Sequence, residues 1–233
     1  TNSALKEGNA LLFNPFVSTD ETLGNSRNWR GILYFNLRVQ YRWQATYTYN
    51  QQTAKTYIYT GSEFRDQTIH NLRFRYRILT NFFGNLEAEI SDVLSDSETF
   101  ASRRYELDQY KISPSLELQN GVNLRTSLFY IYQNKKNLTG IELLNQHELK
   151  TELQWSLASK MSVLGNFSYV NNDFEGNQES VVGNQMMEGL RAGDNFVWQL
   201  QVQRQINSFL QLNLSYDGRK NENSSTIHTG SLQ

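Results

Sequence analysis

Residues 33–49 read LYFNLRVQYRWQATYTY and alternate strictly between two kinds of side chain. The odd positions are aliphatic or aromatic, whereas the even positions are mostly arginine, amide or threonine. A period of two places these two sets on opposite faces of an extended strand. The same alternation recurs along most of the chain. Long strands with one apolar and one polar face are typical of a transmembrane β-barrel.

The composition agrees with such a barrel and excludes several other classes. The chain has 233 residues, enough for a single all-β domain. Its net charge of −1 gives no basic field for nucleic acid, so we expect no nucleic-acid partner. A mean hydropathy of −0.61 argues against helical membrane spans but not against half-polar strands. The absence of cysteine excludes a disulfide scaffold.

The alternation predicts about ten antiparallel strands in residues 31–233, and hence an all-β, antiparallel up-and-down transmembrane β-barrel. Residues 1–30 lack sustained periodicity, and we expect them to be a lead-in or linker from a preceding region. The strands are expected at about 31–49, 62–79, 84–95, 104–119, 121–133, 143–158, 160–171, 189–204, 208–219 and 225–233.

The predicted connections alternate in length. Short ones are expected at 80–84, 120–121, 158–160 and 206–208, and longer polar ones at about 50–61, 93–103, 134–142, 172–188 and 219–224. Short periplasmic turns alternating with longer extracellular loops are typical of barrels in the bacterial outer membrane. We therefore predict an outer-membrane location, with membrane lipid as the partner of the apolar face.

The apolar set defines the residues that we expect to face lipid. They are Leu33, Phe35, Leu37, Val39, Tyr41, Trp43, Phe196, Trp198, Leu200, Leu212 and Leu214. In a soluble β-sandwich, which remains an alternative, a second sheet would cover the same face.

The polar set predicts a ladder of ion pairs. Its members are Arg73, Arg75 and Arg77 on one strand, with Glu87 and Glu89 on the next. A turn near residue 82 would place Arg77 opposite Glu87 and Arg75 opposite Glu89. A barrel of about ten strands has an interior little wider than its side chains, and buried ions must be paired. We therefore expect a lumen filled by arginine, glutamate and glutamine side chains.

No motif for catalysis or metal binding stands out. None of the three histidines has a metal-ligand neighbour at the usual spacing, and no hydrolase, P-loop or dinucleotide fingerprint occurs. An enzyme on the barrel rim would have to use His228 with Ser225 or Ser215, or loop acids. The loop acids are Asp92, Asp96 and Asp108, and their order does not match a calcium-binding loop. We expect no enzymatic activity, no catalytic residue, no cofactor and no metal site.

Three segments carry a resemblance to a known group of proteins. Residues 13–20 (FNPFVSTD) resemble an FNPFxPxDD-like segment, and residues 187–198 (MEGLRAGDNFVW) resemble an MLEGLxPGxNFxW element. Residues 216–230 resemble a terminal YxGRKxExxxxxHTG hairpin. Together they are similar to the C-terminal region of large outer-membrane proteins of Bacteroidota.

This resemblance implies a membrane barrel at the end of a longer protein with a large periplasmic portion upstream. It implies no catalytic residue. Two departures stand out, because Ala192 replaces a common proline and the chain stops at Gln233 rather than at an aromatic residue. We expect a few terminal residues of the barrel to lie beyond Gln233.

The first functional hypothesis is a non-enzymatic barrel that acts as a membrane anchor or structural subunit of a larger envelope assembly, with other envelope proteins as partners. The alternative is a transport, uptake or secretion-associated module, which needs an open lumen or a wider barrel completed by strands outside this chain. A soluble β-sandwich binding module is the second alternative.

Overall fold

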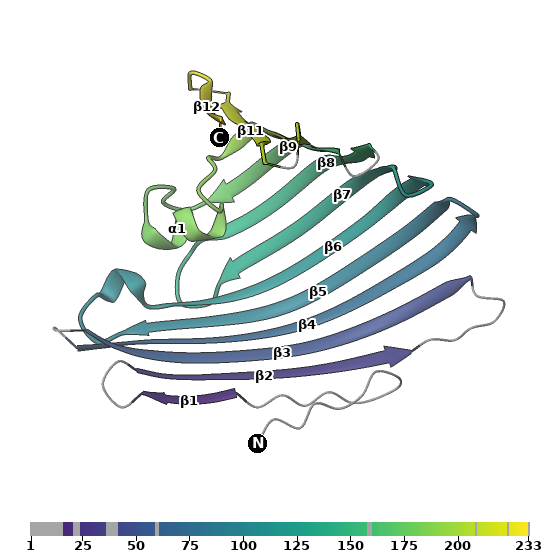
Figure 1. Ribbon diagram of the computed structural model, residues 1–233. Coiled ribbons are helices and arrows are strands. Elements are labelled where there is room, and N and C mark those ends of the chain that lie inside the picture. The colour runs from purple at the N-terminus through teal and green to yellow at the C-terminus, as the bar shows by residue number, and fades with distance from the viewer. Residues whose placement is uncertain are drawn as a thin grey trace.

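The computed structural model describes residues 16–20, 24–35, 42–58, 61–157, 160–207, 209–222 and 224–232, and these form one antiparallel sheet. Each strand pairs with its neighbours in the chain, in the order β1 to β12 (Figure 1). The strands are β1 (Phe16–Asp20), β2 (Gly24–Phe35), β3 (Trp43–Ile58), β4 (Gly61–Leu79), β5 (Phe82–Ser97), β6 (Tyr105–Asn120), β7 (Leu124–Asn137), β8 (Leu143–Leu157), β9 (Met161–Glu175), β10 (Gly193–Gln205), β11 (Gln211–Asn221) and β12 (Ile227–Leu232). Two short helices, η1 (Ala101–Arg103) and α1 (Val181–Met186), interrupt the connections. The all-β, antiparallel up-and-down architecture is confirmed.

The register of the strands sorts the side chains into two faces. Phe74 of β4 lies opposite Leu86 of β5, and Leu116 of β6 lies opposite Leu128 of β7. We call the face that carries these residues the apolar face, and the opposite one the polar face. All four of these apolar side chains are exposed, although large hydrophobic residues normally gain about 1.5–3 kcal/mol each from burial. The described part of the chain therefore presents a broad hydrophobic surface to its surroundings.

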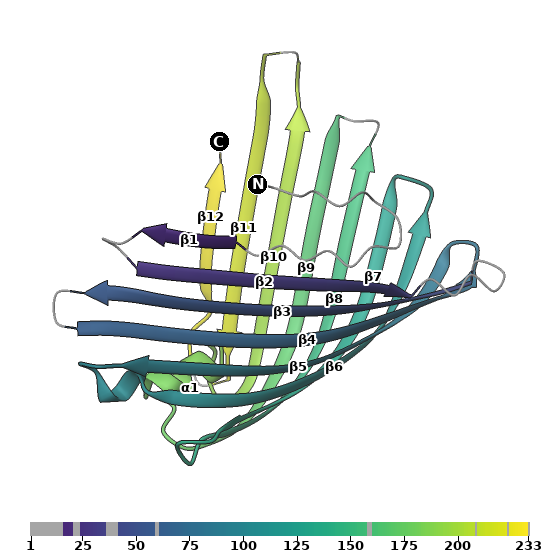
Figure 2. The ribbon, with the colours of Figure 1, turned by 90° about the horizontal axis from the view of Figure 1, so that it is seen from below.

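The described part of the sheet curves strongly but does not close. Figures 1 and 2 show an open trough, and among the described residues β1 pairs only with β2, and β12 only with β11. The polar face lies on the inside of the curve, because side chains two strands apart meet there: Arg75 Nη2 of β4 lies 3.1 Å from Glu117 Oε1 of β6. The expectation of a lumen filled by side chains depends on closure and stays a prediction.

Among the described residues the sheet has twelve strands, two more than the approximate count from the alternation, and residues 33–49 are not one strand. β2 ends at Phe35 and β3 begins at Trp43, and the two strands form a hairpin in which Phe35 lies opposite Ala45. This pairing keeps odd-numbered residues of both strands on one face, so the alternation continues in phase across the turn. A pattern of period two therefore hides the hairpin. Leu37, Val39 and Tyr41 lie outside the described residues.

Two further boundaries differ from expectation. β1 and the start of β2 fall within the expected lead-in 1–30, so part of that segment belongs to the sheet. β3 continues to Ile58 through the expected loop 50–61. This part of β3 is rich in glutamine and threonine, and its pairing with β4 satisfies the backbone without an apolar face.

The two ends of the strands differ. At the short-turn end, residues 80–81 and 121–123 connect neighbouring strands, and Gly121 has a φ of 61°, which favours glycine. At the loop end, residues 98–104, 138–142 and 176–192 form longer connections, of which the last contains α1. Among the described residues, no helix is long and apolar enough to cross a membrane.

A close aromatic contact holds the last strands of the sheet together. Trp198 of β10 lies opposite Gly218 of β11, and its indole covers the glycine. The same ring lies 5.9 Å, centroid to centroid, from the His228 ring of β12. The Trp198 indole therefore occupies the space that a side chain at position 218 would need.

We expect Gly218→Ala to lower the free energy of unfolding by about 1–3 kcal/mol, because the new Cβ would overlap the Trp198 indole and displace it. Urea unfolding in detergent, followed by tryptophan fluorescence, measures this loss. Gly165→Ala is the control, since its Cβ would lie 3.8 Å from Leu153 Cβ and fit without displacement. An equal loss in both variants would contradict the predicted overlap.

Candidate functional site

Tyrosine–histidine pairs mark the apolar face towards the loop end. The hydroxyl of Tyr47 lies 2.7 Å from His70 Nδ1, and that of Tyr130 lies 2.8 Å from His147 Nδ1. The hydroxyl of Tyr216 lies 2.7 Å from His228 Nδ1. These are all three histidines of the chain. Rings with an apolar body and a polar tip suit the boundary between lipid and water.

A second aromatic group lies on the same face towards the short-turn end. Trp43 of β3 lies opposite Tyr76 of β4, and Trp155 occupies the equivalent end of β8. Along β4, His70 and Tyr76 are separated by roughly 20 Å at a rise of about 3.3 Å per residue. Because barrel strands are tilted by about 35–45°, this length corresponds to roughly 15 Å of height, which lies within the apolar band of about 25 Å.

The expected lipid-facing residues that the structure describes occupy apolar-face positions. Phe196, Trp198 and Leu200 alternate along β10, and Leu214 lies opposite Val202 in the same register. Leu212 and Trp43 follow the same parity on β11 and β3. The backbone positions of Leu33 and Phe35 lie opposite Tyr47 and Ala45.

The polar face contains a buried carboxylate between two arginines. Glu117 of β6 is 3% exposed, and its two oxygens each lie 3.1 Å from a guanidinium, of Arg75 and of Arg125. Gln119 also donates a hydrogen bond to Glu117. Arg75 stacks on the ring of Phe83, with 4.2 Å from Cζ to the ring centroid. Together these contacts tie β4, β5, β6 and β7 across the inside of the curve.

The expected ladder lies on this face, but its pairing was wrong. Arg73, not Arg77, lies opposite Glu87, with Nη2 and Oε2 3.2 Å apart. Glu89 lies opposite Asn71 and accepts a hydrogen bond from Asn71 Nδ2 at 3.0 Å. The hairpin turns at residues 80–81, and a bulge follows Arg77, so the register differs from that of a five-residue turn centred near 82.

A register error of this size leaves every residue on its expected face but changes its partner. Arg75 therefore pairs with Glu117 instead of Glu89, and Arg77 lies opposite Phe83. No local pattern in the sequence shows that arginines from two other strands converge on Glu117.

The connection between β9 and β10 folds back over the polar face. Val182 and Met186 of α1, with Met187, are buried against Leu144 of β8 and Leu107 of β6. Ser180 caps the helix, since its Oγ accepts a hydrogen bond from Gly183 N at 2.9 Å. This connection, residues 176–192, is called the α1 loop below. It covers apolar residues on an otherwise polar face.

A buried lysine fastens the α1 loop. Lys135 of β7 is 3% exposed, and its Nζ donates to Met186 O at 2.8 Å and to Glu188 Oε1 at 2.6 Å. Glu188 has a φ of 55°, an uncommon conformation for a residue with a side chain. The pair with Lys135 holds the loop backbone in this conformation.

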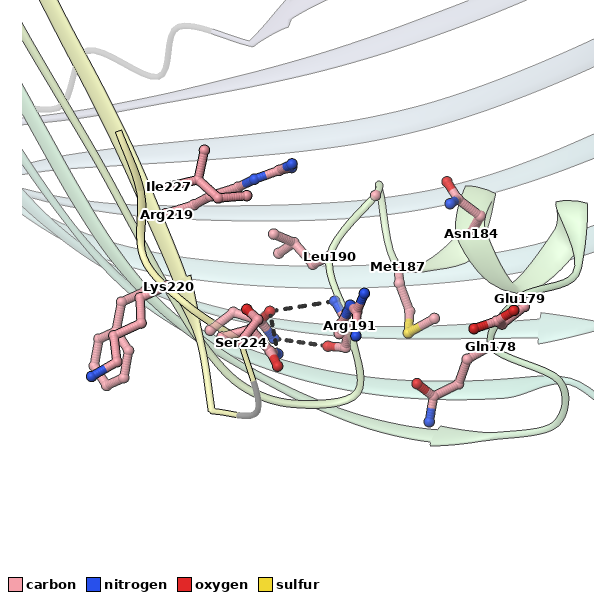
Figure 3. A pocket seen from close by; sticks show the side chains of 14 residues that line it. Gln178, Glu179, Asn184, Met187, Leu190, Arg191, Arg219, Lys220, Ser224 and Ile227 are labelled. Atoms are coloured by element: carbon pink, nitrogen blue, oxygen red, sulfur yellow. Dashed lines mark hydrogen bonds between the residues drawn. The ribbon is translucent and has the colours of Figure 1, made fainter. Parts of the chain in front are cut away.

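A cavity of about 450 Å³ separates the α1 loop from the loop ends of β10, β11 and β12 (Figure 3). Its floor contains the buried amides of Asn195 and Asn221, which hydrogen-bond to each other at 3.0 Å. Arg191 and Arg219 line its sides, and Glu179 lies on the α1 side. The lining is mainly polar.

The residues of the rim-enzyme hypothesis do not come together. His228 is paired with Tyr216 on the apolar face, whereas Ser215 Oγ contacts Ser231 Oγ. Asp92 and Asp108 lie opposite each other on β5 and β6, and Asp96 pairs with Arg104 at 3.3 Å. Among the described residues, no group of three histidine, cysteine, aspartate or glutamate side chains could hold a metal ion.

No protein-family model and no curated protein matches the sequence. Among solved structures, the chain is similar to the siderophore receptor PirA from Acinetobacter baumannii, with a TM-score of 0.60 and 11% identity, over 94% of this chain and 39% of that one. A mutant of the ferric enterobactin receptor PfeA from Pseudomonas aeruginosa gives a TM-score of 0.58 and 10% identity, over 94% and 40%. A loop-deletion mutant of OmpT, an outer membrane protein of Vibrio cholerae, gives 0.51 and 10%, over 93% of both chains.

The chain spans about two fifths of the length of the two receptors. At these identities the likeness concerns the fold. The chain therefore has the fold of outer-membrane β-barrel proteins, and this supports the outer-membrane location that the sequence predicts.

We expect Glu117→Gln to lower the free energy of unfolding by about 1–3 kcal/mol, because Arg75 and Arg125 would lose the buried carboxylate that they share. Glu87→Gln should cost less than about 1 kcal/mol, since the Arg73 side chain is 60% exposed. Urea unfolding of both variants in the same detergent measures the difference. Equal losses would show that the convergence on Glu117 does not stabilise the sheet.

Proposed function

We propose that this chain forms the wall of an outer-membrane β-barrel that serves, without enzymatic chemistry, as a membrane anchor or structural subunit of a larger envelope assembly. The observation that carries the proposal is the two-faced sheet, whose exposed apolar face is bounded by aromatic residues at both ends. Lipid is the environment in which such a face is stable.

The arrangement of the sheet argues against the soluble β-sandwich. A sandwich needs a second sheet packed about 10 Å from the first. All described strands belong to one sheet, and the apolar side chains of β4 to β8 remain exposed on it. The fold of the structural neighbours also supports insertion in a membrane.

The non-enzymatic role is supported by what the polar groups do. The imidazole Nδ1 of each histidine contacts a tyrosine hydroxyl on the apolar face, and Glu117 and Lys135 make structural contacts across strands. These contacts use polar side chains for rigidity. Partner proteins would then contact the loop end, where the α1 loop is held in one conformation.

The full-length protein, extracted in detergent from purified outer membranes, should migrate faster on a gel before boiling than after boiling. We expect Leu153→Arg to reduce this folded band, because arginine on the lipid face of a barrel costs about 2–4 kcal/mol near the midplane. Gln154→Arg is the matched control, since its side chain lies on the polar face of the same strand.

Band intensity after refolding into lipid vesicles measures both variants. Recovery of the parent protein in the soluble fraction without detergent would refute the membrane proposal. An equal defect in the two variants would refute the assignment of the two faces.

A transport or uptake module is the second candidate, favoured by the width of the curve. The sheet stays open among its described residues, and the chain covers about two fifths of the length of each of the two receptors. Further strands outside the described residues would then complete a barrel with room for a lumen. In this case the α1 loop lies across the pathway.

For the transport candidate, we expect Lys135→Met to raise single-channel conductance in planar bilayers, because the α1 loop loses its contacts at Met186 and Glu188. Lys150→Met is the control, since Lys150 pairs with Glu152 on its own strand, away from the loop. Flat currents in the parent and in both variants would favour the anchor.

A further inference from the structure

Two arginines at the cavity beside the α1 loop carry charges that the sheet does not neutralise. Arg191 precedes β10, and Arg219 lies on β11, and Figure 3 shows them on different walls of the cavity. Neither takes part in an ion pair with another described residue. Both are exposed, so a ligand can reach them.

The floor of the cavity fixes the backbone of one of these arginines. Asn195 is 3% exposed. Its Oδ1 accepts a hydrogen bond from Arg191 N at 3.3 Å, and its Nδ2 donates one to Arg191 O at 2.8 Å. Asn172 of β9 donates to the same carbonyl at 3.0 Å. Asn221, 8% exposed, donates to Asn195 Oδ1 at 3.0 Å. The position of Arg191 is therefore set before any ligand arrives.

The carboxylates near the cavity do not cancel these charges. Glu188 is engaged by Lys135, and Glu179 lines the opposite side of the cavity. Asp217 precedes Arg219 by two positions on the polar face but forms no ion pair with it among the described residues. Glu222 and Asp194 lie next to the lining residues Asn221 and Asn195 but do not line the cavity themselves. Among the described residues that do line it, basic side chains outnumber the single carboxylate of Glu179.

We propose that this cavity binds an anionic group, a carboxylate or a phosphate, of a soluble ligand between Arg191 and Arg219. Guanidinium groups bind both anions through paired, charge-assisted hydrogen bonds. A cavity of about 450 Å³ lies within the usual range for small-molecule sites. The inference depends on the proposed function only in that the polar face is turned away from lipid.

A matched control must lie outside the cavity. Arg219 lies opposite Val197 on the polar face, whereas Lys220 lies opposite Phe196 on the apolar face. Lys220 and Phe196 also line the cavity, so a substitution of Lys220 would not separate a soluble ligand from a lipid headgroup. Arg204 lies opposite Leu212 at the short-turn end of β10, outside the cavity, and Arg204→Gln is therefore a control of equal charge change.

The test is titration calorimetry of the full-length protein in a neutral detergent, with inorganic phosphate or citrate at constant ionic strength set by chloride. We expect saturable binding of at least one anion. Arg191→Gln and Arg219→Gln should each weaken it about tenfold, the loss expected for a charged hydrogen bond. Arg219→Lys should retain part of the affinity, and Arg204→Gln all of it.

Three outcomes would overturn the proposal: no saturable binding of either anion, equal affinity in the parent and in the variants of Arg191 and Arg219, or an equal loss of affinity in Arg204→Gln. Binding confined to vesicles that contain phosphatidylglycerol would identify a headgroup contact instead and would also overturn it. The shift of each variant on an unboiled gel reports the folded barrel separately, so a failed barrel is distinguishable from an empty site.

Discussion

The backbone hydrogen bonds between neighbouring strands are the constraint on which the rest of this structure depends. In the hydrocarbon core of a membrane no water replaces a missing partner, so each strand that lies there needs a neighbour on both sides. From β2 to β11 the described strands have such neighbours. The outer edges of β1 and β12 do not, and an exposed strand edge is a template for further pairing. Completion of the sheet is thus a physical requirement of the membrane proposal.

Once the backbone is paired, the two faces are free to meet different solvents. The apolar face carries the hydrophobic side chains outward, with tyrosine–histidine pairs towards the loop end and Trp43 and Trp155 towards the other end. The polar face turns inward, where the curve brings side chains of non-adjacent strands into contact. Glu117 shows the consequence, because its partners Arg75 and Arg125 come from the strands before β5 and after β6.

The α1 loop uses the same inner face for another purpose. Its buried methionines find Leu107 and Leu144 on strands that are otherwise polar, and Lys135 fixes the segment that follows the helix. This packing leaves a cavity between the loop and the last strands rather than a filled interior. The loop and the cavity together make the loop end the most specific surface of the described residues.

The sequence alone determined the two faces of the sheet, the antiparallel up-and-down order and the short turns near residues 81 and 121. These features depend on parity and on turn residues, which are local properties of the chain. The hairpin between Phe35 and Trp43 was not predicted because its pairing preserves parity. The partners of Arg75 and Glu89 were wrong because the next hairpin turns at residues 80–81 rather than near 82 and a bulge follows Arg77. The tertiary structure decided the curvature, the docking of the α1 loop through Lys135 and the convergence on Glu117. Each of these features depends on contacts between residues far apart in sequence. The alternation along a strand specifies which face a side chain is on but not which distant residue it contacts.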